Sequence, residues 1–226
     1  MLIDFEKLDE RFQNPECKAY YDILSKKKGS LLVKRLFDIT VATLLLILLS
    51  PIFLVLSLWI KLDSKGGVFF RQVRVTKYGK EFRIFKFRTM VNNAPSLGSA
   101  VTVKNDARIT RVGHFIRKCR LDEIPQLLNV LTGDMTFVGT RPEVKKYVDA
   151  YSNEMMATLL MPAGITSIAS IKFKDEEKLL DGASDVDKTY IDVVLPQKMK
   201  YNLEYIKDFS FIKDIIICVN TVKEVI

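Results

Sequence analysis

The densest group of charged residues that could do chemistry lies between positions 117 and 142. Two acidic residues, Asp122 and Glu123, stand side by side among these basic residues: Arg117, Lys118, Arg120 and Arg141. An ionised aspartate is a competent nucleophile toward phosphorus, and the guanidinium fork of arginine suits phosphate oxygens. The segment therefore points to transfer of a phosphoryl group.

The Asp122–Glu123 pair is also expected to begin a short helix that ends near Gly133. Pro125 fits this helix because it lies in the first turn. A carboxylate at a helix start accepts backbone N–H bonds and lies at the positive end of the helix dipole, so we expect Asp122 to be ionised. Spacing alone leaves open that the pair only caps a helix and that each basic residue only lies on a solvated helix face.

The same two carboxylates, Asp122 and Glu123, are the candidates for a divalent cation. Substrates with a diphosphate usually arrive with Mg²⁺, which takes oxygen ligands from one or two carboxylates. We therefore expect Mg²⁺ as the cofactor. The three cysteines are far apart and have no metal-binding spacing, which favours free thiols in a reducing compartment.

The formal net charge of +8 indicates a polyanionic partner, either nucleic acid, an anionic membrane face or a phosphorylated substrate. No base-reading module is recognisable, so we expect no nucleic-acid partner. A non-catalytic protein that binds anionic lipid at a membrane surface is an alternative. It would explain the charge, but not an Asp–Glu pair set among cations.

An uncharged apolar run from Ile39 to Ile60 indicates contact with a lipid bilayer. Fifteen of its 22 residues are Leu, Ile, Val or Phe. At the usual insertion values these side chains favour membrane entry by roughly 7 kcal/mol. As a straight helix the run would be about 33 Å long, which is enough to cross a bilayer.

Ser50 and Pro51, in the middle of this run, predict a bend in the helix. Pro51 removes a backbone donor and clashes with the carbonyl of Ile47, at a cost of roughly 3 kcal/mol. We expect the Ser50 hydroxyl to donate to the carbonyl of Leu46. Basic residues flank the run on both sides, which favours a re-entrant helix with both ends in the cytoplasm. A straight span remains the alternative.

The remaining segments predict a mixed α and β structure. Val68–Val75 and Phe82–Arg88 are typical of two strands of a β-hairpin, and helical patterns cover 108–119 and 143–160. Apolar residues recur at helical spacing near the C-terminus, so that helix either packs on the core or lies in the membrane interface. These residues are Ile206, Phe209, Ile212, Ile215, Ile216, Val219, Val222 and Ile226.

Residues 31–226 resemble the bacterial sugar transferases known as small monotopic phosphoglycosyl transferases, which are polyprenyl-phosphate sugar-1-phosphate transferases. The resemblance rests on stretches that occur in the family's order. They are Lys34-Arg-Leu-Phe-Asp38, the Ser50–Pro51 break, Val68-Phe-Phe-Arg-Gln72, Phe85-Lys-Phe-Arg-Thr-Met90 and Leu121-Asp-Glu-Ile-Pro-Gln-Leu-Leu-Asn-Val-Leu-Thr-Gly-Asp-Met135.

The resemblance implies a function and roles for individual residues. Asp122 would be the nucleophile that attacks a UDP-sugar, and Glu123 its partner at Mg²⁺. Polyprenyl (undecaprenyl) phosphate would then accept the sugar-1-phosphate, in the first membrane step of glycan assembly at the cytoplasmic face of the bacterial inner membrane. The expected phosphate-binding residues are Lys86, Arg88, Arg117 and Arg141.

The resemblance also implies an architecture. We predict an α+β, mostly helical monotopic membrane protein with a re-entrant helix bent at Ser50–Pro51, a small β-hairpin and an interfacial amphipathic helix. The chain would divide into a cytosolic extension (1–30), the re-entrant helix (31–62) and a catalytic domain at the cytoplasmic face (63–226). Two stretches depart from the family pattern, Thr140–Pro142 and Met161–Ser170.

Overall fold

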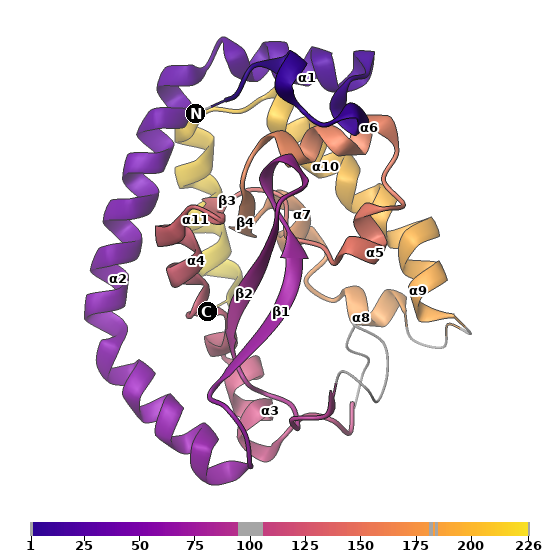
Figure 1. Ribbon diagram of the computed structural model, residues 1–226. Helices are drawn as coiled ribbons and strands as arrows, with labels where there is room; N and C mark the ends of the chain where they lie inside the picture. The colour runs from indigo at the N-terminus through magenta and orange to yellow at the C-terminus, as the bar shows by residue number, and fades with distance from the viewer. Residues whose placement is uncertain (1, 95–105, 181–182, 184, 226) are drawn as a thin grey trace.

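The long helix α2 (Lys28–Asp63) contains the whole apolar run and forms one flank of the molecule (Figure 1). The computed structural model describes residues 2–94, 106–180, 183 and 185–225. In this part of the chain, α2 is the one helix long and apolar enough to cross a membrane. Its most apolar 18-residue window has a mean hydropathy of 2.7, and only 11% of that window is buried. A core helix of a soluble protein would be mostly buried, so the apolar surface of α2 needs another cover.

Pro51 lies inside α2, and the helix continues through it. The Ser50 hydroxyl donates to the carbonyl of Ile47 at 2.8 Å, rather than to Leu46 as we expected. Ile47 is the residue whose carbonyl loses its helical donor when proline occupies position 51. Figure 1 shows α2 bowing away from the rest of the protein and turning back toward it near its end.

The start of α2 is held by a group of buried polar side chains, which we call the anchor cluster (Lys34, Asp38, Thr136, Tyr205 and Asp214). The Lys34 ammonium lies 2.6 Å from a carboxylate oxygen of Asp214, whose other oxygen accepts from the Tyr205 hydroxyl at 2.7 Å. Asp38 accepts from the Thr136 hydroxyl at 2.7 Å and from a backbone N–H at 3.1 Å. The anchor cluster therefore joins α2 to the C-terminal helix and to the segment around Thr136.

The predicted β-hairpin is confirmed. Strand β1 (Phe69–Val75) pairs antiparallel with β2 (Glu81–Phe87), and Phe70 lies opposite Lys86. Gly79 adopts a positive φ of 76° in the connecting turn, which glycine tolerates without strain. In antiparallel pairs opposite residues share a face, so Gln72 and Arg74 lie on the same face as Lys86.

The predicted helix at 122–133 is divided into two elements. Residues Leu121–Glu123 form a 3₁₀ turn, and helix α4 follows at Gln126–Thr132 with Pro125 as its first flanking residue. Helix α3 (Arg111–Lys118) precedes the turn, as expected from the pattern at 108–119. Arg120 turns the chain between them with φ of 54°, in the left-handed region.

A small parallel sheet was missed by the sequence pattern. Strand β3 (Met135–Val138) pairs with β4 (Ala163–Thr166), and neither segment was predicted as a strand. Between them, the predicted helix at 143–160 is wrong. The chain forms α5 (Lys145–Val148), α6 (Asn153–Met156) and a 3₁₀ helix (Ala157–Leu160). Ser152 caps α6 by accepting from the Met155 N–H, which starts a new helix inside the predicted one.

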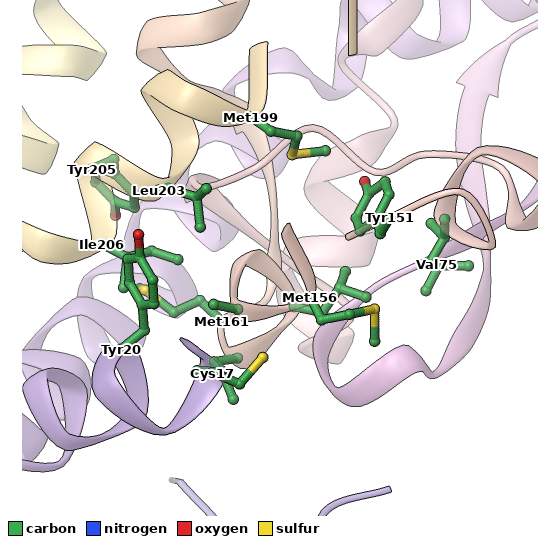
Figure 2. Close-up of a cluster of buried hydrophobic side chains, with 14 of the residues drawn as sticks. Cys17, Tyr20, Val75, Tyr151, Met156, Met161, Met199, Leu203, Tyr205 and Ile206 are labelled. Carbon is green, nitrogen blue, oxygen red and sulfur yellow. The ribbon is translucent and has the colours of Figure 1, made fainter. Parts of the chain in front are cut away.

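Residues 2–27 contribute to the main core. Two 3₁₀ turns (Phe5–Lys7 and Glu10–Phe12) lead to helix α1 (Pro15–Ser25), which packs on α6 and on α10 (Leu195–Lys207). Figure 2 shows Cys17 and Tyr20 among side chains such as Met156, Met161 and Ile206. Residues of this N-terminal segment therefore share one hydrophobic cluster with residues of the C-terminal helices.

The C-terminal part is helical. Short helices α7 (Ile168–Lys172), α8 (Glu176–Leu179) and α9 (Val186–Thr189) precede a π-helical turn (Tyr190–Val194), α10 and α11 (Phe211–Val225). Helix α11 packs on α2 and β3 through buried Asp214 and Ile217. Its outer face exposes an apolar stripe of Ile212, Ile216, Val219 and Val222. Ile226 lies outside the described residues.

Candidate active site

Glu123 is the centre of a charged group formed by three elements, which we call the site cluster (Lys86, Asp122, Glu123 and Arg141). Lys86 of β2 places its ammonium 2.8 Å from one oxygen of Glu123. The guanidinium of Arg141 donates to both oxygens of Glu123, one of them at 3.3 Å. Although burial opposes ionisation, Arg141 and Lys86 together hold the pKa of Glu123 well below its usual range.

Asp122 is in a different electrostatic position from its neighbour. The residue is buried, with only 8% of it exposed. Within the described part of the chain, no N–H or O–H group donates a hydrogen bond to it. Burial raises the pKa of Asp122 above the ordinary aspartate value, and Glu123 acts in the same direction, while Lys86, Arg117 and Arg141 oppose both.

The expectation that a helix terminus would keep Asp122 fully ionised is therefore wrong in its physical basis. The residue lies in a 3₁₀ turn of three residues, which has no side-chain cap bond. Desolvation is the largest influence on its carboxyl group, and the nearby cations limit it. Asp122 thus has no hydrogen-bond donor among the described residues, whereas the adjacent Glu123 accepts from Lys86 and Arg141.

Asn129 of α4 aligns the Asp–Glu pair with Lys86. Its side-chain oxygen accepts from the backbone N–H of Phe85 at 2.8 Å, and its amide donates to the carbonyl of Arg83 at 3.1 Å. These two bonds fix α4 against the edge of β2, one residue before Lys86. Asn129 is fully buried, and the sequence pattern did not single it out.

A buried polar network holds the segment that carries Arg141. Arg74 of β1 donates to the carbonyl of Pro142 at 3.2 Å and lies 3.9 Å from a carboxylate oxygen of Glu143. The other oxygen of Glu143 accepts from the Tyr190 hydroxyl at 2.5 Å, and Lys198 donates to that hydroxyl at 2.8 Å. The position of Arg141 therefore depends on strand β1, the π-helical turn and α10.

Gly164 allows strand β4 to pack closely against the backbone just before Arg141. A Cβ at position 164 would lie 2.2 Å from the backbone nitrogen of Gly139 and 2.3 Å from its carbonyl oxygen, so no side chain fits there. The backbone of Gly164 donates to the carbonyl of Thr140 at 2.8 Å, directly before Arg141. The departure from the family pattern at Met161–Ser170 thus includes a strand that supports the site.

The two remaining predicted phosphate ligands lie at different places. Arg117 extends from α3, where its charge lowers the pKa of Asp122. Arg88 does not join the site cluster. Its buried guanidinium donates to the carbonyls of Ser64, at 2.8 Å, and of Lys65, at the end of α2. Arg88 therefore holds the end of the apolar helix, with only 5% of the residue exposed.

In the site cluster, the carboxylates of Asp122 and Glu123 are the candidate ligands for a divalent cation. Among the described residues, no three His, Cys, Asp or Glu side chains come together as a metal site. Mg²⁺ often binds through one or two carboxylates and completes its shell with substrate phosphates and water. The two adjacent carboxylates fit that requirement when a diphosphate is present.

The sequence of this chain matches the family described as bacterial sugar transferases over residues 29–226. The chain belongs to the bacterial sugar transferase family. The matched range starts after α1, so residues 2–27 are an addition to the family core that packs into it.

Individual relatives agree with this assignment. The UDP-N-acetylgalactosamine-undecaprenyl-phosphate N-acetylgalactosaminephosphotransferase of Aeromonas hydrophila is 38% identical over 197 residues, which cover 86% of this chain and 44% of that protein. The UDP-glucose:undecaprenyl-phosphate glucose-1-phosphate transferase of Escherichia coli is 36% identical over 195 residues, 84% of this chain and 39% of that protein. The sugar transferase EpsL of Bacillus subtilis is 34% identical over 196 residues, 87% of this chain and 88% of that protein. The chain therefore spans less than half the length of the first two relatives and most of the third.

Proposed function

We propose that this chain transfers a sugar-1-phosphate from a UDP-sugar to polyprenyl phosphate by a two-step mechanism at Asp122. The observation that carries the proposal is the asymmetry of the acidic pair. Glu123 accepts hydrogen bonds from Lys86 and Arg141, whereas the neighbouring Asp122 carboxylate has no hydrogen-bond donor among the described residues. The names of the relatives, which specify UDP-sugars and undecaprenyl phosphate, support the donor and acceptor classes.

In the first step, a carboxylate oxygen of Asp122 attacks the donor phosphorus that bears the sugar. An O–P bond forms, the bond to the second phosphate breaks, and UMP leaves with the electron pair. Lys86, Arg117 and Arg141 are cations at the edge of this site and would stabilise the charge on the transferring phosphate and on UMP. The raised pKa of Asp122 makes its ionised form a stronger nucleophile than an ordinary aspartate.

In the second step, a phosphate oxygen of the acceptor attacks the same phosphorus. The bond to Asp122 breaks, the carboxylate is regenerated, and a lipid-linked sugar diphosphate is released. Mg²⁺, held by Asp122 and Glu123 with the substrate phosphates, would supply charge neutralisation when bound. Glu123 also keeps Lys86 and Arg141 in place between the two steps.

We further propose that α2 enters the bilayer from the cytoplasmic face and returns to it. Both ends of the helix are bonded to the same domain, at the anchor cluster and at Arg88. Its middle exposes large apolar side chains, and the apolar stripe of α11 would lie in the interface beside it. This geometry would allow a lipid acceptor and a water-soluble donor to meet at Asp122.

A covalent trap tests the chemistry. Purified protein is incubated with UDP-N-acetylhexosamines, UDP-glucose and UDP-galactose, without acceptor, and examined by intact mass and peptide mapping. We expect UMP release and a sugar-phosphate adduct on the peptide that contains Asp122. UMP release that persists in an Asp122→Ala variant would refute the nucleophile.

The alternative function is a non-catalytic protein that binds anionic lipid. It is favoured only by the net charge and the apolar surface. Asp122→Asn separates the two readings, because the enzyme would lose transfer while binding to anionic vesicles would be unchanged. Wild-type protein that binds vesicles but transfers no sugar-phosphate from any donor would support the alternative.

A further inference from the structure

The side-chain amide of Gln126 is buried without a hydrogen-bond partner. Gln126 is the first residue of α4, and only 1% of it is exposed. Neither its amide nitrogen nor its amide oxygen has a partner among the described residues. An amide enclosed in this way costs free energy in the resting protein. The side chain therefore points to a partner that it meets only during the reaction.

Helix geometry directs this amide toward the acidic pair. The backbone stays right-handed helical through Ile124 and Pro125, with ψ of −39° and −14°, so the 3₁₀ turn and α4 follow one helical path. Helical side chains lean toward the N-terminal end of their helix, over the residues three and four positions earlier. For Gln126 these residues are Glu123 and Asp122.

Of these two carboxylates, Asp122 is the one that lacks a donor. Glu123 already accepts from Lys86 and Arg141, whereas Asp122 accepts from no group among the described residues. Glutamine and aspartate four positions apart form hydrogen bonds on helices. We propose that Gln126 is a positioning residue whose amide N–H donates to the Asp122 oxygen that does not attack phosphorus, an inference that rests on the proposed function.

The face of α4 that carries Gln126 is held firmly against β2. Asn129 lies three residues later on the same face, where it accepts from the N–H of Phe85 at 2.8 Å and donates to the carbonyl of Arg83 at 3.1 Å. These two bonds fix the orientation of the helix from which Gln126 reaches Asp122. Because Gln126 is enclosed, bulk water does not compete for its N–H groups.

The second step of the reaction gains most from this hydrogen bond. In that step the acceptor oxygen forms its bond to phosphorus, the bond from phosphorus to Asp122 breaks, and the carboxylate keeps the electron pair. Negative charge then develops on both carboxylate oxygens, so an amide N–H at the oxygen not bonded to phosphorus stabilises the departing group. In the first step the same carboxylate loses charge, so the hydrogen bond orients the nucleophile without accelerating its attack.

Gln126→Met tests the inference, because methionine keeps the length of the side chain and removes the amide. Leu127→Met is the matched control, since Leu127 is also buried on α4 but packs in the apolar cluster with Val130. The first step is measured as single-turnover release of UMP without acceptor, from the UDP-sugar that gives the most adduct in the covalent trap. The second step is measured on the isolated adduct, as loss of its sugar-phosphate mass after undecaprenyl phosphate is added in detergent micelles.

We expect Gln126→Met to slow the second step about 30-fold and the first step by less than about threefold, so that the adduct accumulates during turnover. The melting temperature should stay the same or rise, because an unpaired buried amide is replaced by an apolar side chain. Leu127→Met should keep the wild-type ratio of the two rates. If Gln126→Met does not fold, Gln126→Leu is measured in the same way.

Three outcomes would overturn the inference. A melting temperature several degrees lower, with both steps slowed equally, would make the amide a structural partner of β2. A higher KM for the UDP-sugar with an unchanged second step would assign the amide to donor binding, and unchanged rates of both steps would leave it without a role in the reaction. Failure of the proposed function looks different, because wild-type protein would then form no adduct.

Discussion

The site cluster and the anchor cluster are both groups of buried charged residues, and they differ in how completely their carboxylates are paired. In the anchor cluster, Asp38 and Asp214 each use both oxygens, with donors between 2.6 and 3.1 Å. In the site cluster, Glu123 is paired in the same way, whereas Asp122 is buried without a donor among the described residues.

This difference shows that buried charged residues can have two different roles in one chain. A buried ion pair with all its hydrogen bonds made contributes little net free energy, but it specifies one arrangement of the elements that it joins. A buried carboxylate without a donor costs free energy in the resting protein. In the proposed mechanism, the donor substrate supplies the partner that Asp122 lacks. The comparison predicts opposite responses to substitution in the two clusters.

The largest effect is expected at Asp122. Asp122→Asn keeps the size of the side chain and removes the nucleophile, so transfer to polyprenyl phosphate should fall by about 10³-fold or more. The melting temperature should stay the same or rise, because a desolvated carboxylate is removed. Radiolabelled transfer and a thermal melt in detergent measure the two effects. A melting temperature several degrees lower would contradict the comparison.

Next in size is the loss of one partner in the anchor cluster. Asp214→Ala removes the carboxylate that pairs with the buried Lys34 ammonium, and the free energy of unfolding should fall by about 3–5 kcal/mol. Activity per folded molecule should change little. Lys34→Met combined with Asp214→Leu should recover most of the loss, as measured by chemical denaturation. Equal stability of the single and double variants would show that the pair is not coupled.

Removal of Lys86 should change how the reaction depends on pH. The positive charge of Lys86 lowers the pKa of Asp122, so its loss raises that pKa further. The ionised nucleophile is present above this pKa, so the acidic limb of the rate profile should move to higher pH in Lys86→Met. The maximal rate of UMP release should also fall about 10²-fold, as for loss of one electrostatic contact in a transition state.

Lys80→Met is the matched control for this experiment. Lys80 is on the same hairpin and pairs with Asp134 at 2.9 Å, but its side chain is 69% exposed. Its substitution should leave the acidic limb in place. If the acidic limb of the pH–rate profile moves equally in both variants, the shift comes from the overall charge of the hairpin and not from Lys86 in particular.

A smaller effect is expected from Arg74, which positions the segment of Arg141 without lying in the site cluster. Arg74→Met removes its bond to Pro142 and its contact with Glu143, so KM for the donor should rise about tenfold. The rate at saturating donor should fall less. Arg74→Lys should restore part of the affinity, and a decrease of both constants by the same factor would point to general misfolding.

The smallest effect is expected at the surface. Lys145 and Asp149 form an exposed pair at 3.3 Å on α5. Lys145→Ala should change the free energy of unfolding by less than about 0.5 kcal/mol. A larger loss, in the range expected for Asp214→Ala, would remove the distinction between buried and exposed pairs.

Local signals predicted the elements that carry most of the site. The alternation of Val, Ile and Phe with the turn at Gly79 predicted the hairpin, and the apolar pattern of 108–119 predicted α3. The resemblance to the family assigned Lys86, Glu123 and Arg141 to one site, and the structure brings these side chains together. The local patterns, in contrast, are carried by neighbours in the sequence, so a single chain is enough to show them.

What the sequence could not show depends on distant partners. The parallel pairing of β3 with β4 joins segments 28 residues apart, and four-residue strands leave almost no periodic pattern. The guanidinium of Arg88 is chemically suited to bind phosphate, but it donates to backbone carbonyls at the end of α2. The raised pKa of Asp122 comes first from burial, which depends on the packing of the whole domain.

The bonding of both ends of α2 to one domain has a mechanical consequence. Arg35 donates to the last carbonyls of α4 at 2.6 and 2.9 Å, and Asp63 accepts from the N–H of Val112 at 3.2 Å. In the proposed membrane placement, the helix cannot tilt independently to match a thicker or thinner bilayer. Hydrophobic mismatch would then have to be absorbed by the surrounding lipid. The height of Asp122 above the acyl chains would be a property of the protein, conserved from one membrane composition to another.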